Sequence, residues 1–166
     1  MQTEQSRAMD TLREVVDDFW TEDFLPEFQE RIWPIICSAY LKDDIDYLSK
    51  ICVGDALMFC RTMIDQRKQT NRQLSHQILW YDAVELVDTK LSKDRRPQLI
   101  VTASVHTVDC VYDRTTKEIV EGSESLIANN MFYLILEPNV DENYLKNTGH
   151  PWQIRTLQTS KQKQLV

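Results

Sequence analysis

LIVTASVHTVDCVY, residues 99–112, is the stretch that decides the fold of this 166-residue chain. Leu99, Val101, Ala103 and Val105 are apolar residues of one parity, which predicts a strand with a buried face. From Val108 to Tyr112 the apolar residues take the other parity, so we expect a β-bulge within the strand. A long strand that changes parity predicts a curved antiparallel sheet.

The second half of the chain supplies partners for this strand. The stretch from Ile78 to Leu91 is rich in β-forming residues, and its parity slip near Asp82 and Ala83 predicts another bulge. A polar loop is expected over residues 141–149. Three further apolar segments are expected to be strands, and they cover residues 119–122, 131–136 and 152–159.

The first half of the chain has helical periodicity. Apolar residues recur at helical spacing over residues 4–20, and a second helix starts near Asp23, with Pro34 expected to kink or break it. A short helix is expected over residues 45–51, and a longer one follows a bend at Gly54 and runs to about Arg67. Helices followed by strands indicate an α+β fold, with N-terminal helices packed on a curved, roughly four-stranded antiparallel sheet. Such a sheet can enclose a cone-shaped cavity against its helices.

Composition narrows the possible functions. Hydrophobic residues make up 42% and charged residues 27% of the chain, which is the balance of one globular domain. The formal net charge of -7 argues against nucleic acid as a partner, because the chain would repel a phosphate backbone. The same charge opposes contact with an anionic membrane unless basic residues cluster. No stretch is long and apolar enough to span a bilayer.

Residue patterns that carry catalysis are sparse. The four cysteines form no CxxC pair and are expected to be buried free thiols. The three histidines lack metal-ligand spacing, so the sequence predicts no metal site, no cofactor and no catalytic residues. One alternative stays open. His106 could pair with Asp82 or Asp109 in the cavity and transfer protons, as in a pocket isomerase or dehydratase.

Four blocks, in order and spacing, carry a resemblance to a known family. They are EFQERIWPIICSAYLKDDIDYLSKICVGDAL (27–57), SHQILWYDAVELV (75–87), PQLIVTASVHTVDCVYDRTTKEIVEGSES (97–125) and WQIRTLQ (152–158). The chain resembles the Tim44-like family, the C-terminal domain of a mitochondrial inner-membrane import translocase subunit. The resemblance divides the chain into an amphipathic leading helix over residues 1–22, a Tim44-like domain over 23–160 and a frayed tail over 161–166.

The resemblance implies a fold, a location and a role. The family's domain has helices on a curved sheet with a large apolar pocket, similar to nuclear-transport-factor-two-like and cystatin-like folds. It lies on the matrix side of the mitochondrial inner membrane, associates with cardiolipin-containing lipid and docks on the translocation channel. The family's full-length protein also recruits the mitochondrial heat-shock chaperone, mainly through a region expected to lie outside this chain.

The implied function is therefore a non-enzymatic scaffold of the presequence translocase import motor. The alternative within the same superfamily is a mitochondrial large-subunit ribosomal protein that anchors ribosomes to the inner membrane. The acidic balance of the chain argues against close contact with ribosomal RNA.

By position, the resemblance assigns two groups of residues. The membrane-contact group belongs to the leading amphipathic segment and consists of Met9, Leu12, Val15, Val16, Phe19 and Trp20. The apolar-pocket group comes from the second helix and the sheet and consists of Trp33, Ile36, Tyr81, Val101, Phe132 and Trp152. An amphipathic helix of this kind can pack on its own domain, on a partner or in a lipid interface.

Overall fold

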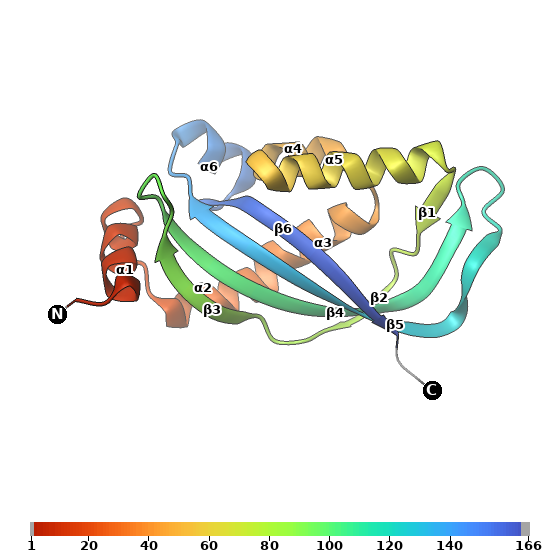
Figure 1. Cartoon of the computed structure of the whole chain (residues 1–166), viewed down its shortest axis with the longest axis horizontal. Helices are drawn as coiled ribbons and strands as arrows, with labels where there is room; N and C mark the ends of the chain where they lie inside the picture. Colours follow the sequence, from red (N-terminus) through yellow and green to blue (C-terminus); the bar gives the residue numbers. More distant parts are fainter. Residues whose placement is uncertain (1, 164–166) are drawn as a thin grey trace.

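Helices occupy the first half of the chain and strands most of the second half in the computed structural model, which describes residues 2–163 (Figure 1). The helical elements are α1 (Glu4–Val15), α2 (Thr21–Glu27), a π-helical turn η1 (Phe28–Ile32), α3 (Trp33–Leu41), α4 (Ile45–Ile51), α5 (Gly54–Gln69) and α6 (Glu142–Thr148). The strands are β1 (Arg72–Leu74), β2 (Ile78–Tyr81), β3 (Glu85–Leu91), β4 (Pro97–Asp113), β5 (Ile119–Pro138) and β6 (Trp152–Lys163). This order confirms the predicted α+β fold.

The six strands form an antiparallel sheet that is only four strands wide at any point. β4 pairs with β5, and β5 pairs with β6. Along the other edge of β4, β1 pairs with residues 111–113, β2 with 105–107 and β3 with 97–102. The predicted width was therefore right. The single strand expected from Ile78 to Leu91 is instead two strands, separated near the predicted slip at Asp82 and Ala83.

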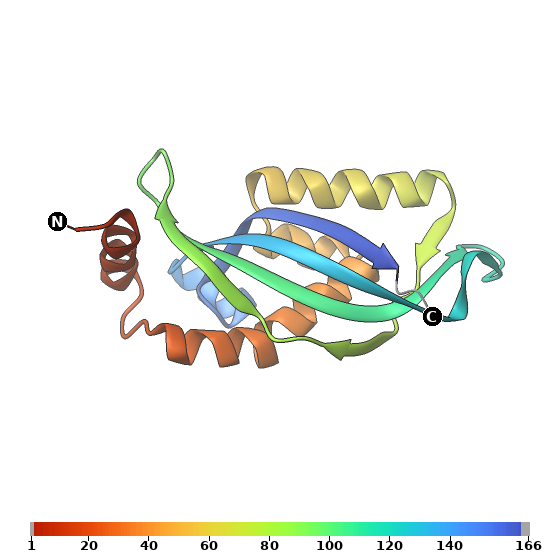
Figure 2. The same ribbon diagram turned by 60° about the horizontal axis from the view of Figure 1, so that its bottom comes forward.

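β4 carries the bend that its sequence predicts. Its pairing with β5 shifts register between Val108 and Cys110, and Gly122 of β5 lies opposite this bulge. A Cβ atom on Gly122, whose φ is +76°, would lie 2.0 Å from the carbonyl oxygen of Asp109, so only glycine fits there. Beyond the bulge, the β4–β5 hairpin turns toward the end of α5 (Figures 1 and 2).

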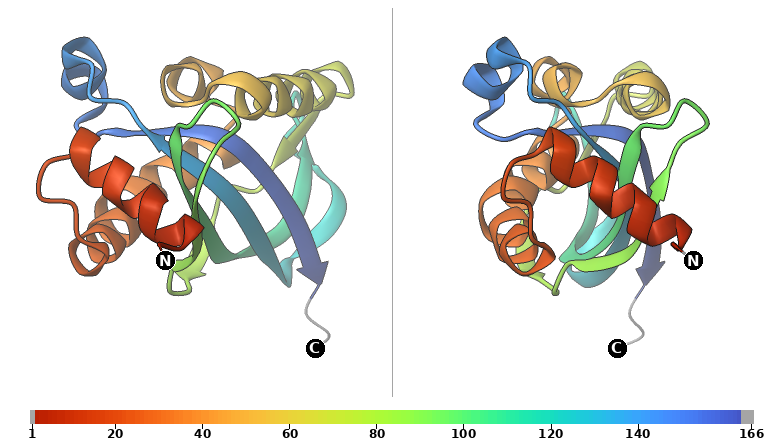
Figure 3. Two further views of the ribbon diagram at one scale, coloured as in Figure 1. Left: turned by 60° about the vertical axis from the view of Figure 1, so that its left-hand side comes forward. Right: turned by 90° about the vertical axis from the view of Figure 1, so that its left-hand side faces the viewer.

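An apolar core fills the space between the helices and the concave face of the sheet. Leu99, Val101 and Val105 of β4 are fully buried in it. Trp33 of α3 meets Phe132 of β5 edge-on, with ring centroids 4.9 Å apart. At one end of the sheet, α1 packs against β3 and β4 (Figure 3). The leading helix is thus part of the same packed body as the rest of the chain.

The helix expected from near Asp23 continues through three pieces, α2, η1 and α3. Pro34 lies in the first turn of α3, directly after the π-helical turn. Proline has no N–H group to donate to the carbonyl group of Glu30, and its ring would clash with that carbonyl in a regular α-helix. The predicted disturbance at Pro34 therefore takes the form of a wider turn just before it.

Two expectations in the last third of the chain were wrong. The segments 119–122 and 131–136 belong to one continuous strand, β5. The loop expected over 141–149 contains α6. Asp141 caps its first turn and Gly149, at φ +77°, ends it, which are ordinary helix-end signals.

The tail was also assigned too early. Residues 161–163 of the expected frayed segment 161–166 continue β6 and pair with β5. The remainder of that segment lies outside the described residues.

Candidate functional site

Four of the six residues predicted to contact a membrane are turned toward the protein. Leu12 of α1 is fully buried, and Phe19, just after α1, is buried in the same core. Met9 and Val16 are partly buried and pack against that core. These side chains support the fold of the domain and are not free to contact lipid in this arrangement.

Val15 and Trp20 are the exposed members of the predicted membrane-contact group, at 37% and 52% exposure. α1 ends at Val15, so Trp20 follows in the segment that leads to α2. The guanidinium group of Arg13 lies 4.6 Å from the centroid of the Trp20 ring. Asp17 and Asp18 border the same hollow as Trp20, so the surface around this aromatic ring is acidic.

The six residues predicted to line an apolar pocket belong to the filled core. Five of them are buried, namely Trp33, Ile36, Val101, Phe132 and Trp152. Tyr81 is partly buried and packs against the same core. Trp152 is enclosed by Phe19 and Phe24, at centroid distances of 5.5 and 5.0 Å. Side chains of the protein therefore occupy the place where the apolar receptacle was expected.

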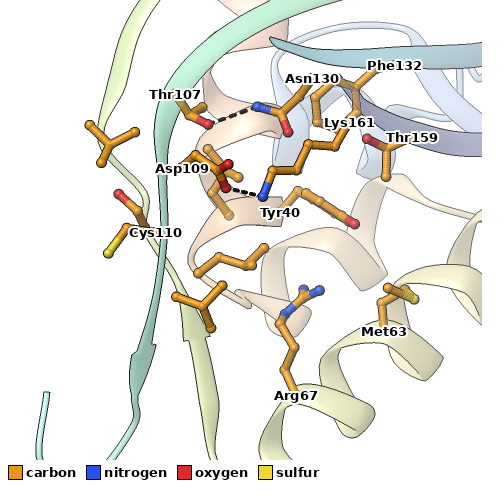
Figure 4. Close-up of a pocket in the computed structure, with 15 residues that line it drawn as sticks. Tyr40, Met63, Arg67, Thr107, Asp109, Cys110, Asn130, Phe132, Thr159 and Lys161 are labelled. Atoms are coloured by element: carbon orange, nitrogen blue, oxygen red, sulfur yellow. Dashed lines mark hydrogen bonds and ion pairs between the residues drawn. The ribbon is translucent and has the colours of Figure 1, made fainter. Parts of the chain in front are cut away.

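A cavity of about 230 Å³ lies between the helices and the inner side of the sheet, at the end where β4 bends (Figure 4). Its apolar wall includes Met63 of α5 and Phe132 of β5. Polar and charged side chains make up the rest of its lining, and they include Tyr40, Arg67, Thr107, Asp109, Asn130 and Lys161. The cavity is thus mixed in character and not the apolar pocket that the resemblance implies.

On the strand side of the cavity, polar groups satisfy one another. Asp109 of β4 is buried and forms an ion pair with Lys161 of β6, whose side chain is 38% exposed. The side-chain amide nitrogen of Asn130 donates to the hydroxyl oxygen of Thr107 at 2.8 Å. The Asn130–Thr107 contact joins the neighbouring strands β5 and β4, whereas the Asp109–Lys161 pair reaches across β5 from β4 to β6, and Figure 4 shows the two contacts side by side.

On the helix side, Arg67 brings a guanidinium group to the cavity. Its Nε and Nη2 atoms donate to Oδ1 of Asp43 at 2.9 and 2.6 Å. Nη2 of Arg114 donates to Oδ2 of the same carboxylate at 2.6 Å, so one aspartate serves two arginines. The Arg67 guanidinium lies 5.5 Å from the ring of Tyr40. Burial raises the pKa of Tyr40, and the nearby Arg67 charge only partly opposes that shift.

The candidate acid/base pair forms, but not inside the cavity. Nε2 of His106 lies 2.8 Å from Oδ2 of Asp82, and the His106 ring stacks on Trp80 with centroids 4.3 Å apart. Successive side chains of a strand point to opposite faces, and Val105 faces the core, so His106 lies on the outer face. Asp109, the other candidate partner, pairs with Lys161 on the inner face. The pair therefore lies outside the cavity in which the sequence placed it, and the Asp82 side chain is half exposed and borders a separate open hollow on the outer face.

The cysteines are buried free thiols, as predicted. Burial raises the pKa of the Cys37 thiol to about 12, which keeps it protonated and unreactive at neutral pH. Within residues 2–163, no group of three or more His, Cys, Asp or Glu side chains is placed to hold a metal ion.

Most of the charged lining of the cavity was missed from the sequence. Asp109 carried a signal, because it is an acidic residue between the apolar Val108 and Cys110 of a buried strand. Lys161 carried none, because it was assigned to the tail. Arg67 gave no signal either, since an arginine in the last turn of a helix normally interacts with the helix dipole in solvent.

No helix within residues 2–163 is long and apolar enough to cross a membrane.

Comparison with known proteins places this fold in a family. No match to the chain is found among curated proteins. The Tim44-like domain matches residues 5–159, which run from the first turn of α1 into the last strand, β6. The chain belongs to the family of Tim44-like domains.

Proposed function

We propose that this chain is a non-enzymatic, membrane-associated scaffold of the mitochondrial presequence translocase. In this role it lies on the matrix side of the inner membrane and tethers the heat-shock chaperone motor to the channel. The family match over residues 5–159 carries the proposal, because the resemblance implies this role and location. The position of the His106–Asp82 pair outside the cavity supports a binding role over a catalytic one.

The membrane contact proposed here is smaller than the sequence indicates. Val15 and Trp20 remain exposed, while Leu12 and Phe19 are held in the core. Trp side chains favour the interface between lipid and water. Each basic residue near an anionic surface contributes only about 1 kcal/mol. Because acidic residues surround Trp20 and the whole chain carries -7, lipid alone is expected to bind weakly. Contacts with channel subunits must therefore supply most of the attachment.

Affinity purification from mitochondria tests the role. A tagged form of the chain should co-purify with channel subunits of the inner-membrane translocase, and with chaperone where the chaperone-recruiting region is present. Recovery of large-subunit ribosomal RNA and proteins instead would support the ribosomal alternative and contradict the scaffold role in import.

Vesicle sedimentation tests the membrane contact. Trp20→Ser should reduce the fraction bound to cardiolipin-containing vesicles by about fivefold. The substitution removes a large aromatic side chain, about half of which is exposed and could be buried in the lipid interface. Met58→Ser is the matched control, since Met58 of α5 is 68% exposed and belongs to no proposed contact. Equal binding by both variants and the unaltered chain would show that Trp20 is not the lipid-contact residue.

A further inference from the structure

We propose that the cavity between α5 and β4–β6 binds a small organic monocarboxylate with a compact apolar body. The side chains that would receive the carboxylate are Arg67, Lys161 and Tyr40, and those that would receive the apolar body are Met63, Leu74 and Phe132. This inference goes beyond the scaffold role and does not depend on it.

The charge of the cavity favours an anion. Arg67 and Lys161 are the cationic residues in its lining, and Asp109 is the anionic one. Asp43 and Arg114 lie behind Arg67. Their charges are opposite and cancel, so they do not alter the net charge of the cavity. The cavity therefore carries an excess of one positive charge, in a chain whose net charge is -7.

Hydrogen-bond donors remain available for such an anion. Within residues 2–163, the hydrogen bonds from Arg67 to Asp43 use Nε and Nη2, and they leave Nη1 on the opposite edge of the guanidinium group. The ammonium group of Lys161 has three N–H bonds and is paired with one carboxylate, that of Asp109. In Figure 4, Arg67 and Lys161 approach the cavity from opposite sides, with Tyr40 between them.

A cationic ligand is disfavoured by the same contacts. Asp109 is the anionic residue of the lining, its side chain is only 6% exposed, and it is already paired with Lys161. A bound ammonium group would have to displace Lys161 and would also be repelled by Arg67. Both effects raise the free energy of the complex.

Size and charge together define the ligand class. The volume of about 230 Å³ has room for a compact ligand, whereas most of a long chain would extend through the open end into solvent. A phosphate monoester carries about −1.5 to −2 charges at neutral pH, more than the single excess charge of the cavity can balance. A monocarboxylate matches that charge and can accept a charge-assisted hydrogen bond from Nη1 of Arg67.

Calorimetric titration of the whole chain with three ring compounds of similar size tests the proposal. The probes are benzoate, neutral benzamide and cationic benzylammonium, and inorganic phosphate serves as an anion without an apolar body. Benzoate should bind at least tenfold more tightly than each of the others. Equal or tighter binding of benzamide, benzylammonium or phosphate, or no binding of benzoate, would overturn the proposal.

Variants locate the binding. Met63→Trp should fill the cavity and reduce benzoate affinity more than tenfold, whereas Met58→Trp places the same side chain on the exposed side of α5 and should leave it unchanged. Lys161→Gln, at the open end, should remove most of the preference for benzoate over benzamide. This second variant keeps the test decisive if Met63→Trp does not fold. Unchanged benzoate binding in either cavity variant would place the ligand elsewhere and contradict the proposal.

Discussion

A single buried carboxylate joins three strands at the end of the sheet away from the cavity. The side chain of Glu137 is 1% exposed and its Oε1 accepts a hydrogen bond from Nε of Arg155 at 2.8 Å. Its Oε2 accepts from Gln98 at 2.7 Å and from Arg96 at 3.1 Å. Burial by itself would raise the pKa of Glu137, but these hydrogen bonds outweigh burial and hold the pKa below its usual 4.5.

We predict that Glu137→Gln lowers the free energy of unfolding at pH 7 by about 3 kcal/mol, because it leaves two arginines without their buried counter-charge. Urea unfolding at neutral pH measures the loss. Glu121→Gln is the matched control, since Glu121 is an exposed residue of the same strand and should change stability by less than about 0.5 kcal/mol.

The same substitution should change how stability depends on pH. A carboxyl group whose pKa is lowered by folding adds stability above its unfolded pKa, and this stability is lost as pH falls through the folded pKa. The unaltered chain should therefore lose its advantage over Glu137→Gln as pH falls below about 4.5. A constant difference between the two proteins from pH 7 to pH 3 would show that the charge of Glu137 is not what stabilises the sheet.

Single residues differ in how far sequence predicts their surroundings. The burial of the four cysteines follows from their apolar neighbours, and the structure confirms it. The pairing of Asp109 with Lys161 does not follow, because it depends on how β5 aligns β4 with β6. For His106, the sequence predicted the partner but not the position. Its pairing with Asp82 was anticipated, but the face on which the pair lies was not.

Among the elements, the long strand β4 was predicted well, whereas the longest strand, β5, was expected as two separate segments. The parity change in β4 predicted a bend, and the bend exists because a bulge at Val108 and Cys110 changes the register against β5. The short strands β1, β2 and β3 share one edge of β4, and no local pattern shows that three segments take turns along it. The ends of α6 do carry local signals, the capping residue Asp141 and the glycine Gly149, but the polar residues between them are equally typical of a loop.

The β4–β5 bend gives a prediction at the scale of elements. Gly122→Ala should destabilise the protein by about 3 kcal/mol or more, because its Cβ would overlap the carbonyl group of Asp109 in addition to the strain of a positive φ. The strand beside the cavity would have to move to relieve this overlap. Thermal and urea unfolding measure the loss.

Gly149→Ala separates the two causes. Gly149 has nearly the same φ, +77°, but a Cβ there meets nothing within 4 Å, so only the strain of about 1 kcal/mol should appear. Similar destabilisation by both substitutions would mean that the close approach of β4 to β5 at Gly122 has no energetic weight.

For the whole molecule, sequence predicts the layers but not how the space between them is filled. The order of helices and strands was enough for an α+β fold with a curved sheet. Whether a curved sheet leaves a pocket depends on the summed volume of side chains from every element that faces it, which no single segment reveals. Here Trp33, Phe28 and Trp152 fill the part expected to be an apolar pocket, and the cavity at the bend of β4 has a lining that is partly apolar and partly charged.

The packing of α1 gives the prediction for the whole molecule. A chain that begins at Asp23 loses Leu12 and Phe19 from the core, and burial of each such side chain contributes about 1.5–3 kcal/mol, so stability should fall by about 4 kcal/mol. Leu12→Ala should cost about 3 kcal/mol by itself. Val15→Ala, on the exposed side of the same helix, should change stability by less than about 0.5 kcal/mol. Urea unfolding midpoints compare the three proteins with the unaltered chain. If the shortened chain unfolds at the unaltered midpoint, α1 adds nothing to the core, and the whole apolar face of the helix becomes available to lipid.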